Sequence, residues 1–246
     1  MRPRGALRSV AGMDIQATIP ETVLLLALDD ATGKPVLDAS TLAQALGGAG
    51  LAELVVRGRL RIAGEGEAVK PCRFLTSTAV VEPTLEAFVE HGDGRTPKDA
   101  LARVVGWGGK SAPVQRLRAE LLGELVAEGA LAHSETRWLG IAWSERWERG
   151  ARTDREDAMQ ARARELLQGA EPTPADEHLV AALAILHGAK ALPKVFPDLD
   201  AKALGERADA LSLGSWSSAA VRSAIDELQV ALMTTMIVVP IVTSSS

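Results

Sequence analysis

The sequence of 246 residues contains one cysteine, no tyrosine, three phenylalanines and five tryptophans. The single cysteine, Cys72, excludes an intrachain disulfide, which fits a reducing compartment. With so few aromatic side chains, the core must be built from alanine, leucine and other aliphatic residues, which favour helices. Hydrophobic residues make up 47% of the chain and charged residues 24%, the balance of an ordinary globular protein.

The chain also has no excess of positive charge and no long hydrophobic run. A formal net charge of −5 excludes a general electrostatic attraction to nucleic acid or to an anionic membrane, so such binding would need a local basic patch. The longest apolar run, Val230 to Val242, contains Pro240 and is too short for a membrane span. It predicts a buried helix that ends near the proline.

The first twelve residues, MRPRGALRSVAG, carry three arginines but not the continuous apolar core that a secretion signal needs. We therefore expect a flexible basic tail over residues 1–12, a folded domain over residues 13–246 and a cytoplasmic location. Met13 offers an alternative start, and in that case the tail is not translated.

Catalytic and cofactor motifs are missing from the sequence. Gly109-Lys110-Ser111 suggests a phosphate-binding loop, but that motif needs a glycine five residues before Gly109, where Val104 stands. No pair among the four histidines has the four-residue spacing that would place two metal ligands on one helix face. We therefore expect a protein that is not an enzyme and that holds no cofactor and no metal.

Hydrophobic patterning predicts a mainly α fold, with one helical domain and a little β structure. In the segment 41–56 the only charge is Glu53, so we expect a helix that is buried on nearly every side, with Ser40 as its N-cap. The remaining helices are expected at 21–28, 83–104, 114–128, 152–168, 174–191, 200–211 and 217–239. Extended structure is expected at 59–63 and 68–82, and a β-hairpin at 130–147.

The sequence contains one internal echo. LAELVVRGRL at 51–60 matches LGELVAEGAL at 122–131, and in both a helix is followed by a glycine and then by an extended segment. Glycine in this position adopts the left-handed conformation that ends a helix. We expect Arg57 to pair with Glu53, four residues earlier, and Arg59 and Arg61 to point to solvent from the following strand.

Three stretches together resemble the Golgi phosphoprotein 3 family, including its bacterial members. These are ETVLLLALDDATGKP (21–35), LAELVVRGRLRI (51–62) and HLVAALAILHGAKALPKVF (178–196), with RAELLGELVAEGAL (118–131) in order between them. The resemblance implies a single helical domain around a buried helical core, with a protruding β-hairpin. It also implies a non-catalytic peripheral membrane adaptor that binds phosphatidylinositol 4-phosphate and the tails of glycosyltransferases.

The family's lipid pocket is carried over only in part. The resemblance places Asp38 at the position of the family's tryptophan and Gly47 at that of an arginine. Two further family arginines correspond to Gln115 and Arg118, and Arg116 lies beside them. A phosphate monoester needs several converging donors, so the identity of the lipid is left open, with Gln115, Arg116 and Arg118 as the candidate head-group residues.

The hairpin is the second candidate membrane contact. Three of the five tryptophans fall within ten of its residues, flanked by Arg137, Arg146 and Arg149. Indole rings favour the membrane–water interface, and arginines bind lipid phosphates. The alternative is that these side chains cover the helical core. The candidate contact residues are Arg137, Trp138, Leu139, Ile141, Trp143 and Trp147.

Three functions follow as hypotheses. The first is a peripheral adaptor that binds a phosphoinositide such as phosphatidylinositol 4-phosphate, or another anionic lipid. The second is a protein-interaction or oligomerisation module that has lost lipid binding and contacts a protein partner or a second copy through the hairpin. The third is a winged-helix nucleic-acid binder, which is disfavoured because its recognition helix would carry Glu120, Glu124 and Glu128.

Overall fold

The computed structural model describes residues 17–63, 72–106, 111–138, 141–214 and 218–235. Within this part, the side chains of residues 135–145 and of Ala220 are not described. The fold is mainly α, as the sequence predicts, and strands occur in the described part only as three two-stranded antiparallel sheets. The expected tail and the boundary at residue 13 lie outside the described residues, so the division into domains stays a prediction.

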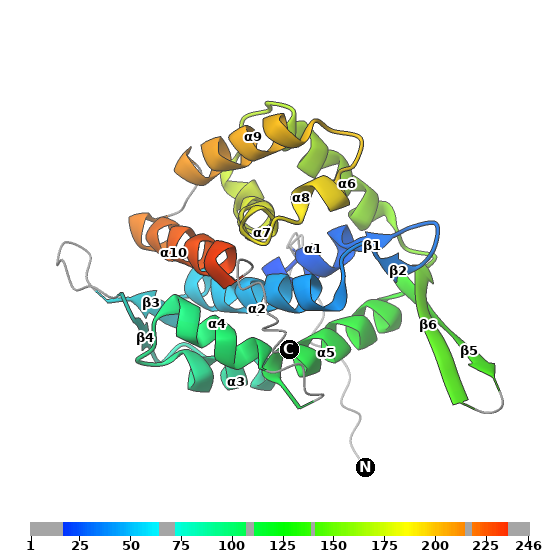
Figure 1. Ribbon diagram of the computed structural model, residues 1–246, viewed down its shortest axis with the longest axis horizontal. Coiled ribbons are helices and arrows are strands. Elements are labelled where there is room, and N and C mark those ends of the chain that lie inside the picture. Colours follow the sequence, from blue (N-terminus) through cyan, green and yellow to red (C-terminus); the bar gives the residue numbers. More distant parts are fainter. Residues whose placement is uncertain (1–16, 64–71, 107–110, 139–140, 215–217, 236–246) are drawn as a thin grey trace, which may run out of the picture.

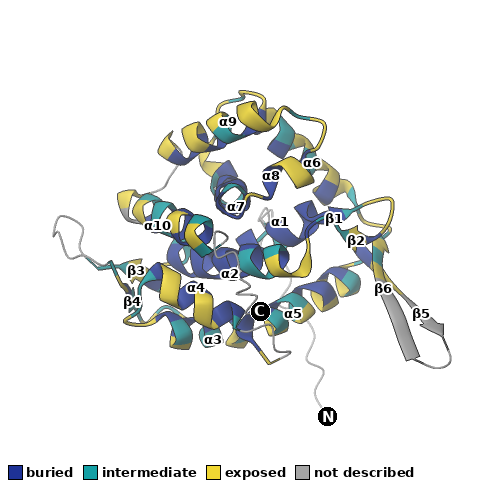
Figure 2. Cartoon of the chain, in the orientation of Figure 1, coloured by how far each residue is buried: buried dark blue, intermediate teal, exposed yellow. Residues whose placement is uncertain are grey.

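The centre of the fold is helix α2 (Ala39–Val56), in which every residue from 45 to 55 is buried. Six helices contact α2, and Figure 1 shows them on all sides of it. They are α1 (Ile19–Leu26), α3 (Pro83–Gly92), α4 (Pro97–Val105), α5 (Pro113–Glu128), α7 (Glu177–Gly188) and α10 (Ala219–Thr235). In Figure 2, α2 and α7 are mostly dark blue, which marks buried residues, while α9 is mostly exposed.

Of the remaining elements, β3 (Leu60–Ile62) follows α2 directly and contacts it, and the others lie further away. The helical ones are α6 (Asp154–Leu167), the 3-10 turn η1 (Pro174–Asp176), α8 (Leu192–Val195) and α9 (Ala201–Gly214), and the α-helices among them form the upper layer of Figure 1. The strand pairs are β1 (Leu28–Asp29) with β2 (Lys34–Pro35), β3 (Leu60–Ile62) with β4 (Phe74–Thr76), and β5 (Leu131–Trp138) with β6 (Ile141–Arg149). The last pair is the predicted hairpin, and it projects from the body of the molecule (Figure 1).

Neighbouring helices approach α2 closely because it carries glycine at the contact points. A Cβ added at Gly50 would lie 2.5 Å from Cε1 of Phe88 in α3. Real Cβ atoms do not come so close to a neighbour, so glycine is required for α3 to pack at this distance.

The two similar segments of the sequence, 51–60 and 122–131, end their helices in the same way. In the first copy, Gly58 has φ +68° and its amide donates to Val55 O, while the Arg59 amide donates to Leu54 O. In the second, Gly129 has φ +78° and its amide donates to Val126 O, while the amide of the next residue donates to Leu125 O. Both ends are Schellman motifs, and a β-strand follows each of them.

Several expected boundaries are wrong in detail. Asp38, not Ser40, caps α2, and its carboxylate accepts from the Thr41 amide at 2.9 Å. The expected helix 83–104 is two helices, because Gly94 takes φ +67° and Thr96 starts a new helix with Pro97 at its first position. Residues 174–176 form a 3-10 turn, and α7 ends at residue 188.

Two further expectations about individual side chains need correction. Arg59 does not point to solvent, because its guanidinium donates to Ser77 O and pairs with Glu86 at 2.5 Å. Arg61 is exposed, as expected. The apolar run that begins at Val230 is not uniformly buried, since Val230 is 58% exposed on α10. Residues 236–242 of that run lie outside the described residues.

Candidate lipid-binding surface

The three candidate head-group residues lie on the first turns of α5. Gln115 and Arg118 are three residues apart and share one side of the helix, whereas Arg116 is exposed on another side. Gln115 and Arg118 are both partly buried. The structure therefore places Gln115 and Arg118 on the same side of α5. Arg116 lies on a neighbouring side of the same helical turn.

Arg118 differs from Arg59 and Arg149 in its contacts. Among the described residues, the buried Nε atoms of Arg59, Arg118 and Arg149 have no hydrogen-bond partner. Arg59 and Arg149 bind carboxylates through their other nitrogens. Arg118 makes no hydrogen bond or ion pair with any described residue, so its guanidinium is free to bind an anion.

Asp38, which the resemblance places at the position of the family's tryptophan, is the N-cap of α2. Its carboxylate accepts from the amide of Thr41 at 2.9 Å and from the Thr41 hydroxyl at 2.7 Å, and Nζ of Lys194 lies 3.3 Å away. These hydrogen bonds, with the Thr41 amide first, lower the pKa of Asp38 from 3.8 to about 2. Asp38 is therefore an ionised helix cap, a role that needs no lipid.

Gly47, which the resemblance places at the position of a family arginine, lies in the contact between α2 and α4. A Cβ at this position would be 2.8 Å from Cγ2 of Val105 and 3.2 Å from Cδ1 of Leu101. The packing of α4 leaves no room here for an arginine side chain.

The hairpin that the sequence predicts is present, and its strands pair with His133 opposite Trp147 and Trp138 opposite Ile141. Trp147 is partly buried at the root of the hairpin, where its ring stacks on His133 at 4.2 Å and its amide donates to Gly33 O at 2.8 Å. The side chains of Arg137, Trp138, Ile141 and Trp143, and Leu139 as a whole, lie outside what the structure describes. Their contact with a membrane stays a prediction.

Arg149, at the end of the hairpin, forms ion pairs with carboxylates of the protein itself. It pairs with Asp30 of the β1–β2 turn at 3.5 Å and with Asp157 of α6, and its Nε lies 3.9 Å from the buried Glu156. Burial, followed by the nearby charge of Asp30, raises the pKa of Glu156. Arg149 therefore holds the root of the hairpin through these carboxylates, whereas the sequence analysis placed it among the arginines that bind lipid phosphates. Arg146 is exposed.

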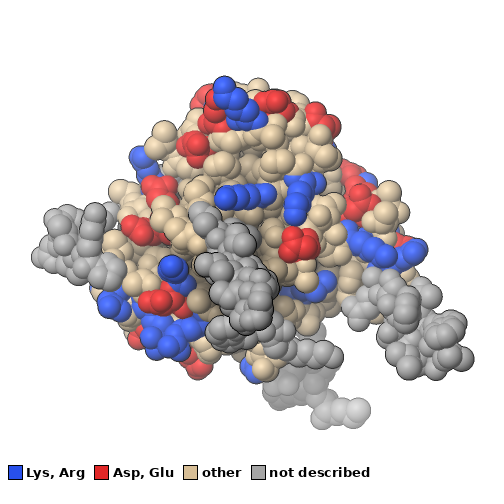
Figure 3. Space-filling view, in the orientation of Figure 1, with Lys and Arg blue, Asp and Glu red and all other residues tan. Residues whose placement is uncertain are grey.

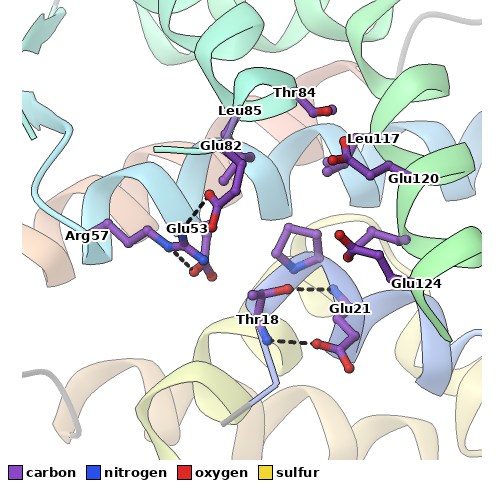
Figure 4. A pocket seen from close by; sticks show the side chains of 12 residues that line it. Thr18, Glu21, Glu53, Arg57, Glu82, Thr84, Leu85, Leu117, Glu120 and Glu124 are labelled. Carbon is purple, nitrogen blue, oxygen red and sulfur yellow. Dashed lines mark hydrogen bonds and ion pairs between the residues drawn. The ribbon is translucent and has the colours of Figure 1, made fainter. Parts of the chain in front are cut away.

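A second feature, which the sequence did not indicate, is a small acidic pocket between the starts of α1 and α3, the end of α2 and the middle of α5 (Figure 4). Its volume is about 90 Å³ and its apolar walls come from Pro20, Leu85, Leu117 and Leu121. Five carboxylates and one guanidinium line it: Glu21, Glu53, Glu82, Glu120, Glu124 and Arg57.

Only part of this negative charge is balanced. Arg57 pairs with Glu53 and Glu82, both at 2.6 Å, and Arg155 pairs with Glu21 at 2.8 Å. Glu120 and Glu124 form no ion pair with any described residue, and in Figure 4 no dashed line reaches them. Burial, and then the charge of Glu120, raise the pKa of Glu124.

The sequence profile described as Golgi phosphoprotein 3 (GPP34) matches residues 19–228 of the chain. The chain belongs to the Golgi phosphoprotein 3 family. No curated protein matches it. The family consists of non-enzymatic adaptors. Within this Golgi phosphoprotein 3 fold, no group of three or more His, Cys, Asp or Glu side chains in the described ranges is arranged to hold a metal ion.

Two properties of this Golgi phosphoprotein 3 family member bear on membrane binding. By length and composition one described helix, α2, could cross a membrane, but 72% of its apolar window is buried inside the fold, as in the core helix of a folded domain. The face of the molecule in Figure 3 intersperses basic with acidic side chains and shows no large patch of one sign. On this face, any attraction to an anionic surface must therefore be local.

Proposed function

We propose that this chain is a peripheral membrane-associated, non-catalytic adaptor that binds a phosphoinositide such as phosphatidylinositol 4-phosphate, or another anionic lipid, from the cytoplasmic side. The observation that carries the proposal is Arg118, a partly buried guanidinium without a protein partner in the described part of the chain. A guanidinium binds phosphate oxygens through parallel N–H donors, and Arg116 adds a second positive charge within two residues. Family membership supports the adaptor role.

The hairpin supplies the second contact in this proposal. The strand pairing places Arg137, Trp138, Ile141 and Trp143 toward the end of the strands furthest from the root, which Arg149 and Trp147 hold. Leu139, outside the described residues, is proposed as a contact with them. Indole rings inserted at the interface would anchor the hairpin at the membrane, and each arginine near an anionic surface contributes about 1 kcal/mol.

Co-sedimentation with liposomes tests the proposal. Vesicles of phosphatidylcholine alone are compared with vesicles that also contain phosphatidylinositol 4-phosphate or phosphatidylserine, at low and at physiological salt. Since about 1 kcal/mol corresponds to roughly a fivefold change in affinity, Arg118→Gln is expected to weaken binding about fivefold. Arg103→Gln, which removes an exposed arginine from α4, is the matched control and is expected to bind as the unmodified chain does. If the chain binds none of these anionic vesicles even at low salt, the lipid proposal is wrong.

A specific observation favours the alternative, a protein-interaction or oligomerisation module. Two positions of the family's lipid pocket have structural uses here: Asp38 caps α2 and Gly47 packs against α4. Light scattering on the unmodified chain and on Trp143→Glu distinguishes the two functions. Loss of an oligomer in Trp143→Glu with unchanged liposome binding would favour the alternative.

A further inference from the structure

The acidic pocket between α1, α2, α3 and α5 has a feature that the lipid proposal does not use. Its apolar walls and the uncompensated carboxylates of Glu120 and Glu124 match a ligand that presents positive charge on a short apolar segment. Three of its carboxylates are already paired with arginines of the fold, Glu53 and Glu82 with Arg57 and Glu21 with Arg155. The unused binding capacity is therefore on the α5 side of the pocket.

The sequence itself supplies a segment of this chemistry beside the pocket. Thr18, the N-cap of α1, lines the pocket, so the chain that precedes α1 leaves from its edge. The first thirteen residues contain Arg2, Arg4 and Arg8, with Leu7 and Val10 among them, and no carboxylate side chain. The ten residues from Arg8 to Thr18 can span at most about 33–36 Å, which is ample to return to a pocket that begins at Thr18.

We propose that the basic N-terminal segment, residues 1–12, docks into this pocket and places its arginines against Glu120 and Glu124. The two partners belong to one chain, and the short connection gives a high effective concentration, so even a weak contact is populated. Because Glu124 is exposed and Glu120 only partly buried, the contact depends on ionic strength. The Debye length falls from about 10 Å at 0.1 M salt to about 3 Å at 1 M. The proposal does not depend on lipid binding.

Paramagnetic relaxation in the full-length chain tests the docking. A nitroxide is attached at Ser9→Cys in a Cys72→Ser background, and the amide signals of the rest of the chain are recorded by NMR. Docking predicts a selective loss of signal at residues 82–85 and 117–124, with the signals of α9 unchanged, and recovery of the lost signals in 1 M salt. A loss that is uniform over the molecule, or no loss at 117–124, overturns the proposal.

Matched variants separate a charge contact from mere proximity. Glu120→Gln with Glu124→Gln removes the two uncompensated carboxylates and is expected to restore the signals at 117–124. Glu90→Gln with Glu227→Gln removes the same charge away from the pocket and is expected to leave the signal loss unchanged. Equal effects of the two pairs would show a non-specific attraction to the negative chain, which contradicts the proposal.

A final control addresses which molecule occupies the pocket. A nitroxide-labelled chain without isotope is mixed with an isotope-labelled chain without nitroxide. Docking within one chain predicts no signal loss in this mixture. Selective loss at 117–124 there would mean that the segment of a second copy occupies the pocket, and docking within the chain would be wrong.

Discussion

The carboxylate of Glu53, near the end of α2, accepts a hydrogen bond at 2.8 Å from the backbone amide of Ile19, the first residue of α1. Its other oxygen accepts from Nε of Arg57 at 2.6 Å, and the Glu53 side chain is only 1% exposed. The only charge in the central helix therefore satisfies an unpaired amide at the start of another helix and places a negative charge at its positive end. This contact, between residues 34 positions apart, joins the two helices where the acidic pocket begins.

Glu53→Ala is expected to lower the free energy of unfolding by about 3 kcal/mol, because it leaves a buried amide without a partner and breaks a buried ion pair. Glu53→Gln keeps an acceptor for the Ile19 amide but loses the charge, and we expect a cost of about 1.5 kcal/mol. Urea unfolding measures the change in the free energy of unfolding of both variants, provided that their m-values equal that of the unmodified chain. Glu90→Ala, an exposed residue, is the control, and a cost for Glu53→Ala no larger than that of this control would contradict the assigned role.

Gly50→Ala and Gly123→Ala are expected to change stability in opposite directions. A Cβ at Gly50 meets the ring of Phe88 at 2.5 Å, so overpacking should cost about 1–3 kcal/mol. A Cβ at Gly123, in α5, meets nothing within 4 Å, so the higher helix propensity of alanine should add about 0.5–1 kcal/mol. Thermal unfolding of both variants provides the comparison. A change of the same sign in the two variants would show that the helices around α2 are not packed as described.

Asp176 should stabilise the fold only above acidic pH. Two hydrogen bonds from Arg162, at 3.0 and 2.9 Å, and then one from the Thr173 amide lower the pKa of Asp176 from 3.8 to about 2. Since the folded state favours the ionised form, this stability is fully present above pH 3.8 and is lost as the pH falls through about 2. Asp176→Asn should therefore cost on the order of 2 kcal/mol at pH 6.

Urea unfolding of Asp176→Asn and the unmodified chain across this pH range checks the prediction. The difference between their free energies of unfolding should shrink as the pH falls from 5 toward 2. Asp154→Asn, an exposed carboxylate at the start of α6, controls for the loss of one charge. A difference that is independent of pH would mean that the pair with Arg162 does not set the pKa of Asp176.

Arg149→Met is expected to loosen the hairpin root. The substitution leaves Asp30, Glu156 and Asp157 without their shared counter-ion, and Glu156 is buried. Hydrogen exchange of the β5 and β6 amides should become faster while exchange in α2 stays as it was, because local opening does not require global unfolding. Arg146→Met, on the exposed part of the same strand, is the control and should leave the exchange of β5 and β6 unchanged. Equal exchange rates of the β5 and β6 amides in the two variants would show that Arg149 does not stabilise the root of the hairpin.

The candidate site could be predicted from sequence only in part. The order of motifs indicated the family, and a helix of sixteen residues with one charge indicated the buried centre of the fold. The role of Asp38 was missed, although Asp38 followed by Thr41 is a cap pattern and could have been recognised. The acidic pocket left no local signal, because its carboxylates come from four helices that are distant in the sequence.

The sequence by itself determined which segments are helical, which of them is buried, and where α2 and α5 end. These properties depend on neighbours a few residues away, through hydrophobic periodicity and through Gly58 and Gly129 in the left-handed conformation. Apart from the predicted pair of Arg57 with Glu53, only the tertiary structure decided what the charges do. Arg59 turns inward to Glu86, Arg149 binds the hairpin root, and Arg118 keeps no described partner. A charged side chain finds its partner through space, and at these sites the partner is supplied, or not, by the packing of separate elements.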